Sequence, residues 1–184
     1  MAFWTMHKGK NTNKRPNTIT GLSLFELLVS LLILSILSLL AVPSFQRWQE
    51  KNAFKHFATR VTELAKQTRI QALAQKKTFY LIAKIETDNC LMVSADQDCS
   101  CASYQTCALN EAFYWELPTA WNTKLRTVGS TDKTVAFNKH GTLNFGSNTT
   151  FTLSSQRFSA KVTFSSLGRI RLCSEQYFVG IAPC

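Results

Sequence analysis

The longest apolar run in the sequence covers residues 22–42 and is interrupted by one acidic side chain, that of Glu26. As a helix, these 21 residues would be roughly 31 Å long, enough to cross the hydrocarbon layer of a membrane. Four basic residues and no acidic one precede the run, which predicts a cytoplasmic N-terminus with the remainder outside. A carboxylate inside such a segment is costly, so Glu26 is expected to meet a partner.

A helical pattern of a different kind follows directly. From Ser44 to about Gln75, apolar residues recur at spacings near three and four, with polar and charged residues between them. This pattern predicts an amphipathic helix that continues the apolar one. Pro43 lies at the junction and is expected to kink or loosen the helix there, because its ring opposes the carbonyl group one turn earlier.

After Lys77 the period changes to two, and β-branched and aromatic residues become frequent. Strands are predicted at residues 78–85, 134–138, 149–153, 160–164, 168–173 and 176–181. Turn-forming residues separate several of them, at 140–141, 146–148 and 165–168. The predicted fold class is therefore α+β, with a long N-terminal helix, half transmembrane and half amphipathic, packed on an antiparallel β-sheet.

All six cysteines follow the apolar run, and in an oxidising compartment an even number favours disulfides. They are Cys90, Cys99, Cys101, Cys107, Cys173 and Cys184. The sequence leaves their pairing open, although proximity favours Cys173 with Cys184 and two bridges within 90–107. Metal binding by Cys99, Cys101 and Cys107 is the competing interpretation, but paired C-x-x-C motifs and a nearby histidine are missing. Residues 86–130 are predicted to form a disulfide-tied insert at the sheet edge, with one strand at 112–117.

Composition narrows the function classes further. The net charge of +10 favours polyanionic partners such as nucleic acid or an anionic membrane surface. Beyond residue 21 the only histidines are His56 and His140, and neither lies in a nucleophile or metal motif. We therefore expect a protein that is not an enzyme and that needs neither a metal nor another cofactor.

The start of the apolar run resembles the processing signal of type IV prepilins. Gly21 precedes an apolar residue, Glu26 is the fifth residue after it, and basic residues lie upstream. The resemblance implies that a prepilin peptidase removes residues 1–21 as a leader, leaving Leu22 as a methylated N-terminus. Family members usually begin with Phe and then Thr or Ser, where this chain has Leu22 and Ser23. A secretory signal or a plain membrane anchor would leave Gly21 and Glu26 unexplained.

The same resemblance implies how the mature chain is organised. Residues 22–43 would be a transmembrane and assembly helix of the inner membrane, and residues 44–184 a periplasmic pilin-like domain that reaches the cell surface after assembly. In the filament, Glu26 would pair with the N-terminal amine of a neighbouring pilin. Removal of the leader, which carries four basic residues and no acidic one, would leave +6 of the +10 net charge.

The C-terminal half resembles minor pilins and pseudopilins of the GspH/FimT type. Residues 135–141 (VAFNKHG) resemble the family's F-x-x-x-G turn, and residues 162–173 (VTFSSLGRIRLC) resemble its closing hairpin. The Gly-Arg-x-Arg element at Gly168, Arg169 and Arg171 is associated with DNA binding in FimT-type pilins of natural transformation. The resemblance thus implies a minor pilin that binds extracellular double-stranded DNA.

Physical chemistry is consistent with a phosphate site at this element. In a strand, Arg169 and Arg171 would project from one face roughly 6.6–6.8 Å apart, and arginine forks bind phosphate bidentately. Gly168 would permit a tight turn and a close approach of the polyanion, and Lys161 is expected to extend the patch. Alternatives remain open. The arginine pair could lie on a merely solvated strand face, and the protein could be a GspH-like pseudopilin of a type II secretion system or a minor pilin that primes assembly without DNA binding.

Overall fold

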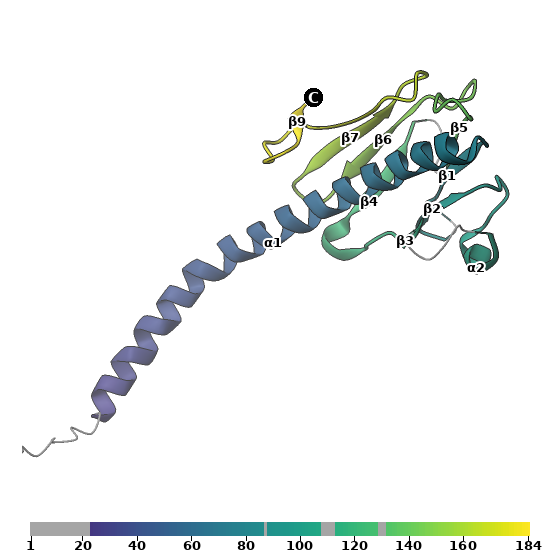
Figure 1. Ribbon diagram of the computed structural model, residues 1–184. Helices are drawn as coiled ribbons and strands as arrows, with labels where there is room; N and C mark the ends of the chain where they lie inside the picture. Colours follow the sequence, from purple (N-terminus) through teal and green to yellow (C-terminus); the bar gives the residue numbers. More distant parts are fainter. Residues whose placement is uncertain (1–22, 87, 108–112, 129–131) are drawn as a thin grey trace, which may run out of the picture. The chain divides into compact units, whose positions relative to one another are not determined.

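The computed structural model describes residues 23–86, 88–107, 113–128 and 132–184 (Figure 1). The predicted cleavage after Gly21 and the predicted methylation of Leu22 lie outside the described residues. The chain divides into two units, residues 1–44 and residues 45–184. Each unit is considered by itself below.

Helix α1 extends from Leu24 to Gln75, so the predicted pair of consecutive helical segments is confirmed. Ser23 caps its start, because the Ser23 Oγ accepts a hydrogen bond of 3.1 Å from the backbone N–H of Glu26. Pro43 lies inside the helix, which continues through it. The helix ends where Lys76 adopts a left-handed backbone conformation with φ of 55°.

The described part of the first unit is an apolar helix without protein packing. The large apolar side chains described on it are all exposed, by between 37% for Val29 and 79% for Leu24. Three serine hydroxyls, those of Ser30, Ser35 and Ser38, donate to backbone carbonyls of the preceding turn and thus need no outside partner. Within the described residues, α1 is the one helix long and apolar enough to cross a membrane.

The second unit contains two β-sheets where the sequence predicts one. The first sheet has the order β3-β2-β1-β5 and the second the order β4-β6-β7-β8-β9. All pairings are antiparallel except that of β8 with β9. The strands are β1 (Phe79–Lys84), β2 (Cys90–Ser94), β3 (Tyr114–Glu116), β4 (Lys124–Thr127), β5 (Lys133–Phe137), β6 (Thr149–Ser154), β7 (Ser159–Phe164), β8 (Ile170–Ser174) and β9 (Ala182–Pro183).

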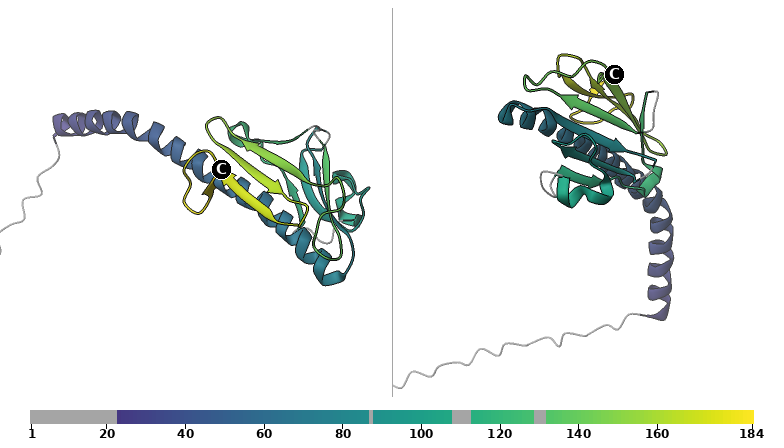
Figure 2. Two further views of the ribbon diagram at one scale, coloured as in Figure 1. Left: turned by 90° about the horizontal axis from the view of Figure 1, so that it is seen from above. Right: turned by 90° about the vertical axis from the view of Figure 1, so that its right-hand side faces the viewer.

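The main core lies between the second part of α1 and both sheets (Figures 1 and 2). Phe54, Val61 and Leu64 from the helix are fully or almost fully buried against sheet residues such as Leu81 and Phe151. The alternation predicted from period two is visible in β7, where every second side chain is buried. The predicted α+β class is confirmed, and all members of this core come from residues 45–184.

The cysteine-rich insert was predicted to lie at the sheet edge. In the structure it also covers a face of the first sheet. It contains the 3-10 helix η1 (Cys101–Ser103) and the short helix α2 (Tyr104–Cys107). Disulfides join Cys90 to Cys101 and Cys99 to Cys107. Cys90 lies on β2, so the first bridge holds the insert over a second buried cluster around Ile82 and Met92. Strand β2 is therefore buried on both faces and lies between β3 and β1. The sequence did not predict this strand, because the composition of residues 86–130 has no regular apolar pattern.

A further 3-10 helix, η3 (Ala120–Asn122), precedes β4.

The C-terminal segment also differs from its prediction. Residues 176–181 were expected to form a strand but make a turn closed by an isolated bridge between Phe178 and Ile181. Phe178 is 2% exposed and packs against Phe54 and Phe158, with ring centroids 5.7 and 5.3 Å apart. The apolar pattern therefore reflects a buried anchor in a loop. The Cys173–Cys184 disulfide closes this loop, and β9 pairs with β8 in parallel.

Candidate nucleic-acid interface

The arginine pair follows a tight turn at residues 165–168, between β7 and β8. The N–H of Gly168 donates to the carbonyl of Ser165 at 2.8 Å, and the N–H of Ser165 donates to the carbonyl of Arg169 at 3.0 Å. The Ser165 hydroxyl accepts a further bond from the N–H of Arg169 at 3.2 Å. Arg169 therefore lies at the end of the turn, one residue before β8 begins at Ile170. The observed strand thus begins two residues after the start of the predicted strand 168–173.

Gly168 is buried and packs against the chain itself, which differs from its predicted role in contacting a polyanion. Its φ is +77°, and a Cβ at this position would overlap the carbonyl oxygen of Gly141 and lie 3.1 Å from Nε of Arg69. Position 168 therefore requires glycine because the backbone of the 138–141 turn approaches it closely. Gly168 thus acts on the site by positioning Arg169, and its close backbone contact is with Gly141.

Arg169 and Arg171 are both exposed, whereas Ile170 and Leu172 pack against the core, as the alternation predicts. Arg171 is opposite Thr163 in the register of β7 with β8. Together the two arginines line a shallow depression that we call the outer hollow, formed by Thr163, Ser165, Arg169, Arg171, Cys173 and Cys184. Hydroxyl and guanidinium donors thus share one surface that contains no acidic residue.

Lys161 is close to this surface but its charge is largely offset. Its Nζ lies 3.2 Å from a carboxylate oxygen of Glu175, and both side chains are about half exposed. Hydrogen bonds from Lys161 and then Ser159 hold the pKa of the Glu175 carboxyl below its ordinary value, so this carboxyl is ionised at neutral pH. The expectation that Lys161 extends the basic patch is therefore weakened by an acid that the sequence places fourteen residues away.

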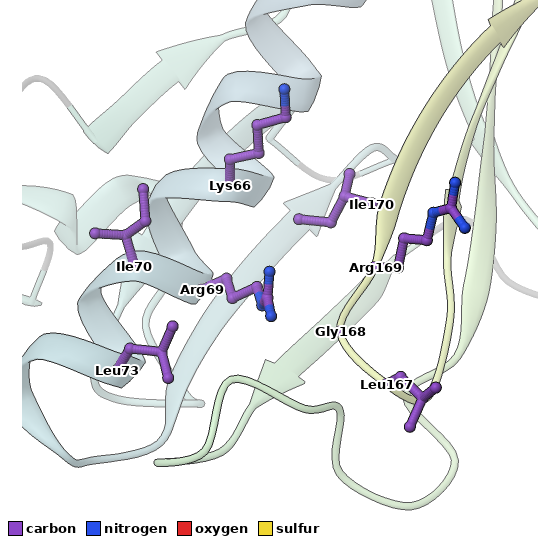
Figure 3. Close-up of a pocket in the computed structure, with 8 residues that line it drawn as sticks. All are labelled: Lys66, Arg69, Ile70, Leu73, Leu167, Gly168, Arg169 and Ile170. Carbon is purple, nitrogen blue, oxygen red and sulfur yellow. The ribbon is translucent and has the colours of Figure 1, made fainter.

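A second basic surface lies on the helix side of the same turn and was missed from the sequence. The helix-side groove is lined by Lys66, Arg69, Ile70 and Leu73 of α1 and by residues 167–170 (Figure 3). Arg69 Nε donates to the carbonyl of Gly141 at 2.9 Å. The one sequence signal was the i, i+3 spacing of Lys66 and Arg69, which places both on one face of a helix. Their position beside residue 168 depends on the tertiary fold.

The remaining predicted site residues lie elsewhere. Glu26 is exposed in the first turn of α1, three residues after the capping Ser23. The Ser-x-x-Glu spacing is that of a capping box, of which the structure shows the bond from the Glu26 N–H to Ser23 Oγ. Within the described residues there is no group of three or more His, Cys, Asp or Glu side chains that could hold a metal ion.

Comparison of the structure with solved structures shows which class of protein has this fold. Two crystal forms of the type IV minor pilin FimU from Pseudomonas aeruginosa are similar to it. The first has a TM-score of 0.53 and 17% identity and covers 68% of this chain and 91% of FimU. The second has a TM-score of 0.50 and 18% identity, with coverages of 64% and 90%.

The chain therefore has the fold of a type IV minor pilin, in agreement with the resemblance found in the sequence. No protein-family model matches the sequence. A comparison with curated proteins found no significant match to the sequence.

Proposed function

We propose that this chain is a minor subunit of a type IV filament that binds the backbone of double-stranded DNA during uptake in natural transformation. The observation that carries the proposal is the pair of exposed arginines, Arg169 and Arg171, in a hollow that no Asp or Glu side chain lines, in a minor-pilin fold. Two guanidinium forks on a rigid hairpin are suited to bidentate phosphate contacts. The runner-up, a GspH-like pseudopilin or assembly-priming pilin, would share the fold without needing these arginines.

The remaining parts of the proposal follow from the predicted leader and the apolar helix. Cleavage by a prepilin peptidase after Gly21 would expose the amine of Leu22, and residues 22–43 would hold the subunit in the inner membrane until other pilins take it up. The periplasmic domain would then reach the cell surface with the filament. A subunit of this kind binds and assembles, and no catalytic role is proposed.

Replacement of Arg169 and Arg171 by glutamine tests DNA binding. Because each arginine is expected to bind one phosphate, the slope of log affinity against log salt should fall by about two, and affinity at physiological salt by about thirtyfold. Fluorescence anisotropy of the full chain in neutral detergent with labelled duplexes of unrelated sequence measures both values. Duplex sequence should matter little, because no base-reading element is evident.

The matched control is Lys124→Gln with Arg126→Gln. These two residues are also exposed and two positions apart, on β4 of the same sheet, three strands or roughly 14 Å from β8. The control removes equal charge and should keep most of the affinity. Equal losses of affinity in the two double variants would show nonspecific charge attraction only and would favour the assembly pilin without a DNA site.

Glu26 is tested by two substitutions that separate charge from helix capping. Both variants keep the backbone hydrogen bond from residue 26 to Ser23 Oγ. Glu26→Gln also keeps a side chain that can complete a capping box, whereas Glu26→Ala removes that side chain as well as the charge. If the carboxylate pairs with a neighbouring subunit's amine, both variants should insert in the membrane yet enter sheared filaments at least tenfold less than wild type. Normal incorporation of Glu26→Gln with loss for Glu26→Ala would assign Glu26 to capping alone.

A further inference from the structure

Cationic side chains lie on both sides of the 165–168 turn. Arg169 and Arg171 face the outer hollow, while Lys66 and Arg69 line the helix-side groove. In Figure 3, Arg69 points from α1 toward the turn at Gly168, whereas the Arg169 side chain lies on the far side of that segment. The turn is therefore a ridge with positive charge along each flank.

These four cations have no acidic partner in the described part of the chain, unlike four other basic residues of the domain. Arg60, Lys84, Arg157 and Lys161 each form an ion pair, with Glu63, Asp132, Glu50 and Glu175 respectively. No acidic residue lines the helix-side groove or the outer hollow. Like charges gathered without counter-charges attract polyanions, because binding relieves their mutual repulsion.

Arg69 is held in place before any ligand arrives. It is partly buried, and its Nε–H is used by the carbonyl of Gly141, 2.9 Å away. Its terminal nitrogens have no hydrogen-bond partner within the described residues, so these donors are available for an anion. A guanidinium already held in one orientation loses less conformational entropy on binding phosphate than a free arginine does.

The helix-side groove has room for a sugar–phosphate segment. Its volume is about 350 Å³, and the exposed apolar side chains of Ile70 and Leu167 lie beside the cations. Leu167, at the tip of the turn, is 76% exposed. An apolar tip can touch base edges without hydrogen-bonding to them, which suits a partner of arbitrary sequence.

We infer that the 165–168 turn enters the major groove of a DNA duplex, with one strand's phosphates on Arg169 and Arg171 and the other strand's on Lys66 and Arg69. A major groove about 12 Å wide admits a two-stranded β-ribbon, and the strands of the β7–β8 hairpin lie about 4.8 Å apart. This inference deepens the proposed function and rests on it, because it adds contacts with the second DNA strand to the proposed phosphate site at Arg169 and Arg171.

The test uses the full chain in detergent with a labelled DNA duplex and, separately, one of its single strands. Lys66→Gln is the main variant, since Lys66 is exposed and forms no ion pair or hydrogen bond within the described residues. It should lower duplex affinity about fivefold at physiological salt and reduce the salt slope by about one, as expected when a single cation no longer binds its phosphate. Single-strand affinity should stay at the wild-type value, because one strand can be held by the arginine pair alone. Lys124→Gln is the control and should change neither.

A second readout observes Arg69 without mutating it, since Arg69→Gln would also remove the bond to Gly141. The Arg69 Nε–H signal in a nitrogen–proton NMR spectrum should shift when duplex is added, and shift less in Lys66→Gln. An unshifted Arg69 signal, a Lys66→Gln variant that binds duplex like Lys124→Gln, or equal losses of affinity for duplex and single strand would each overturn the two-strand arrangement.

The outcomes for the two proposals are separable. If Arg169→Gln with Arg171→Gln abolishes binding while Lys66→Gln has no effect, DNA binding at β8 stands and the two-strand arrangement fails. If the arginine variant binds duplex as wild type does, the proposed function fails at its own residues, and the arrangement built on it fails too.

Discussion

Gly168→Ala should lower the free energy of unfolding by about 2–5 kcal/mol. The left-handed backbone conformation would destabilise the alanine variant by about 1–2 kcal/mol, and displacing a packed neighbour would destabilise it by about 1–3 kcal/mol more. The displaced neighbour is the carbonyl of Gly141, which a Cβ would overlap and which also accepts the hydrogen bond of Arg69. The variant should therefore also lose DNA affinity, because Arg169 and Arg69 are both repositioned.

Gly146→Ala is the matched control for this result. Gly146 has a similar φ of +79°, but nothing lies within 4 Å of a Cβ built there. Gly146→Ala should lower the free energy of unfolding only by the conformational part, about 1–2 kcal/mol, and leave DNA affinity unchanged. Urea unfolding of residues 45–184, which contain the whole main core, followed by tryptophan fluorescence, measures both variants. Equal destabilisation of the two would mean that the packing of the two turns against each other is not a constraint on Gly168.

Replacing Cys173 and Cys184 together by alanine should lower the free energy of unfolding by about 3 kcal/mol. The bridge closes a loop of sequence separation 11, and its loss restores conformational entropy to the unfolded chain. The loop around Phe178 should then open more often, although the packing of Phe178 on Phe54 and Phe158 still holds it. Urea unfolding gives the loss of stability, and limited proteolysis after Tyr177, which is 81% exposed, reports the opening.

Replacing Cys99 and Cys107 by alanine provides the comparison. That bridge closes a loop of sequence separation 8, so its entropic contribution is close to the first one. Its loss should destabilise the domain by a similar amount without accelerating cleavage near Tyr177. Unchanged stability of the Cys173/Cys184 variant would show that packing of Phe178 alone closes the C-terminal loop. DNA affinity should persist in both variants, because the β7–β8 pairing positions Arg171.

Local patterns predicted the parts of the fold that depend on near neighbours in sequence. The spacing of apolar residues predicted the second part of α1 and its end near Gln75, because a helix places residues three and four apart on one face. Alternation predicted β1, β5, β6 and β7 closely and placed Arg169 and Arg171 outward with Ile170 and Leu172 inward. The same rule failed at 176–181, where one buried aromatic anchor in a turn produces an apolar pattern like that of a strand.

The sequence by itself therefore determined the long helix, the α+β class and the outward arginine pair, since each follows from a period of two or about 3.6 residues. Only the tertiary structure decided the division into two sheets and the burial of Gly168 beneath Gly141. It also decided that Arg69 lies beside the turn at Gly168 while Glu175 offsets Lys161. These interactions join residues far apart in the chain or on neighbouring strands, and no local period encodes them, because they arise from how helix, turns and sheets pack together.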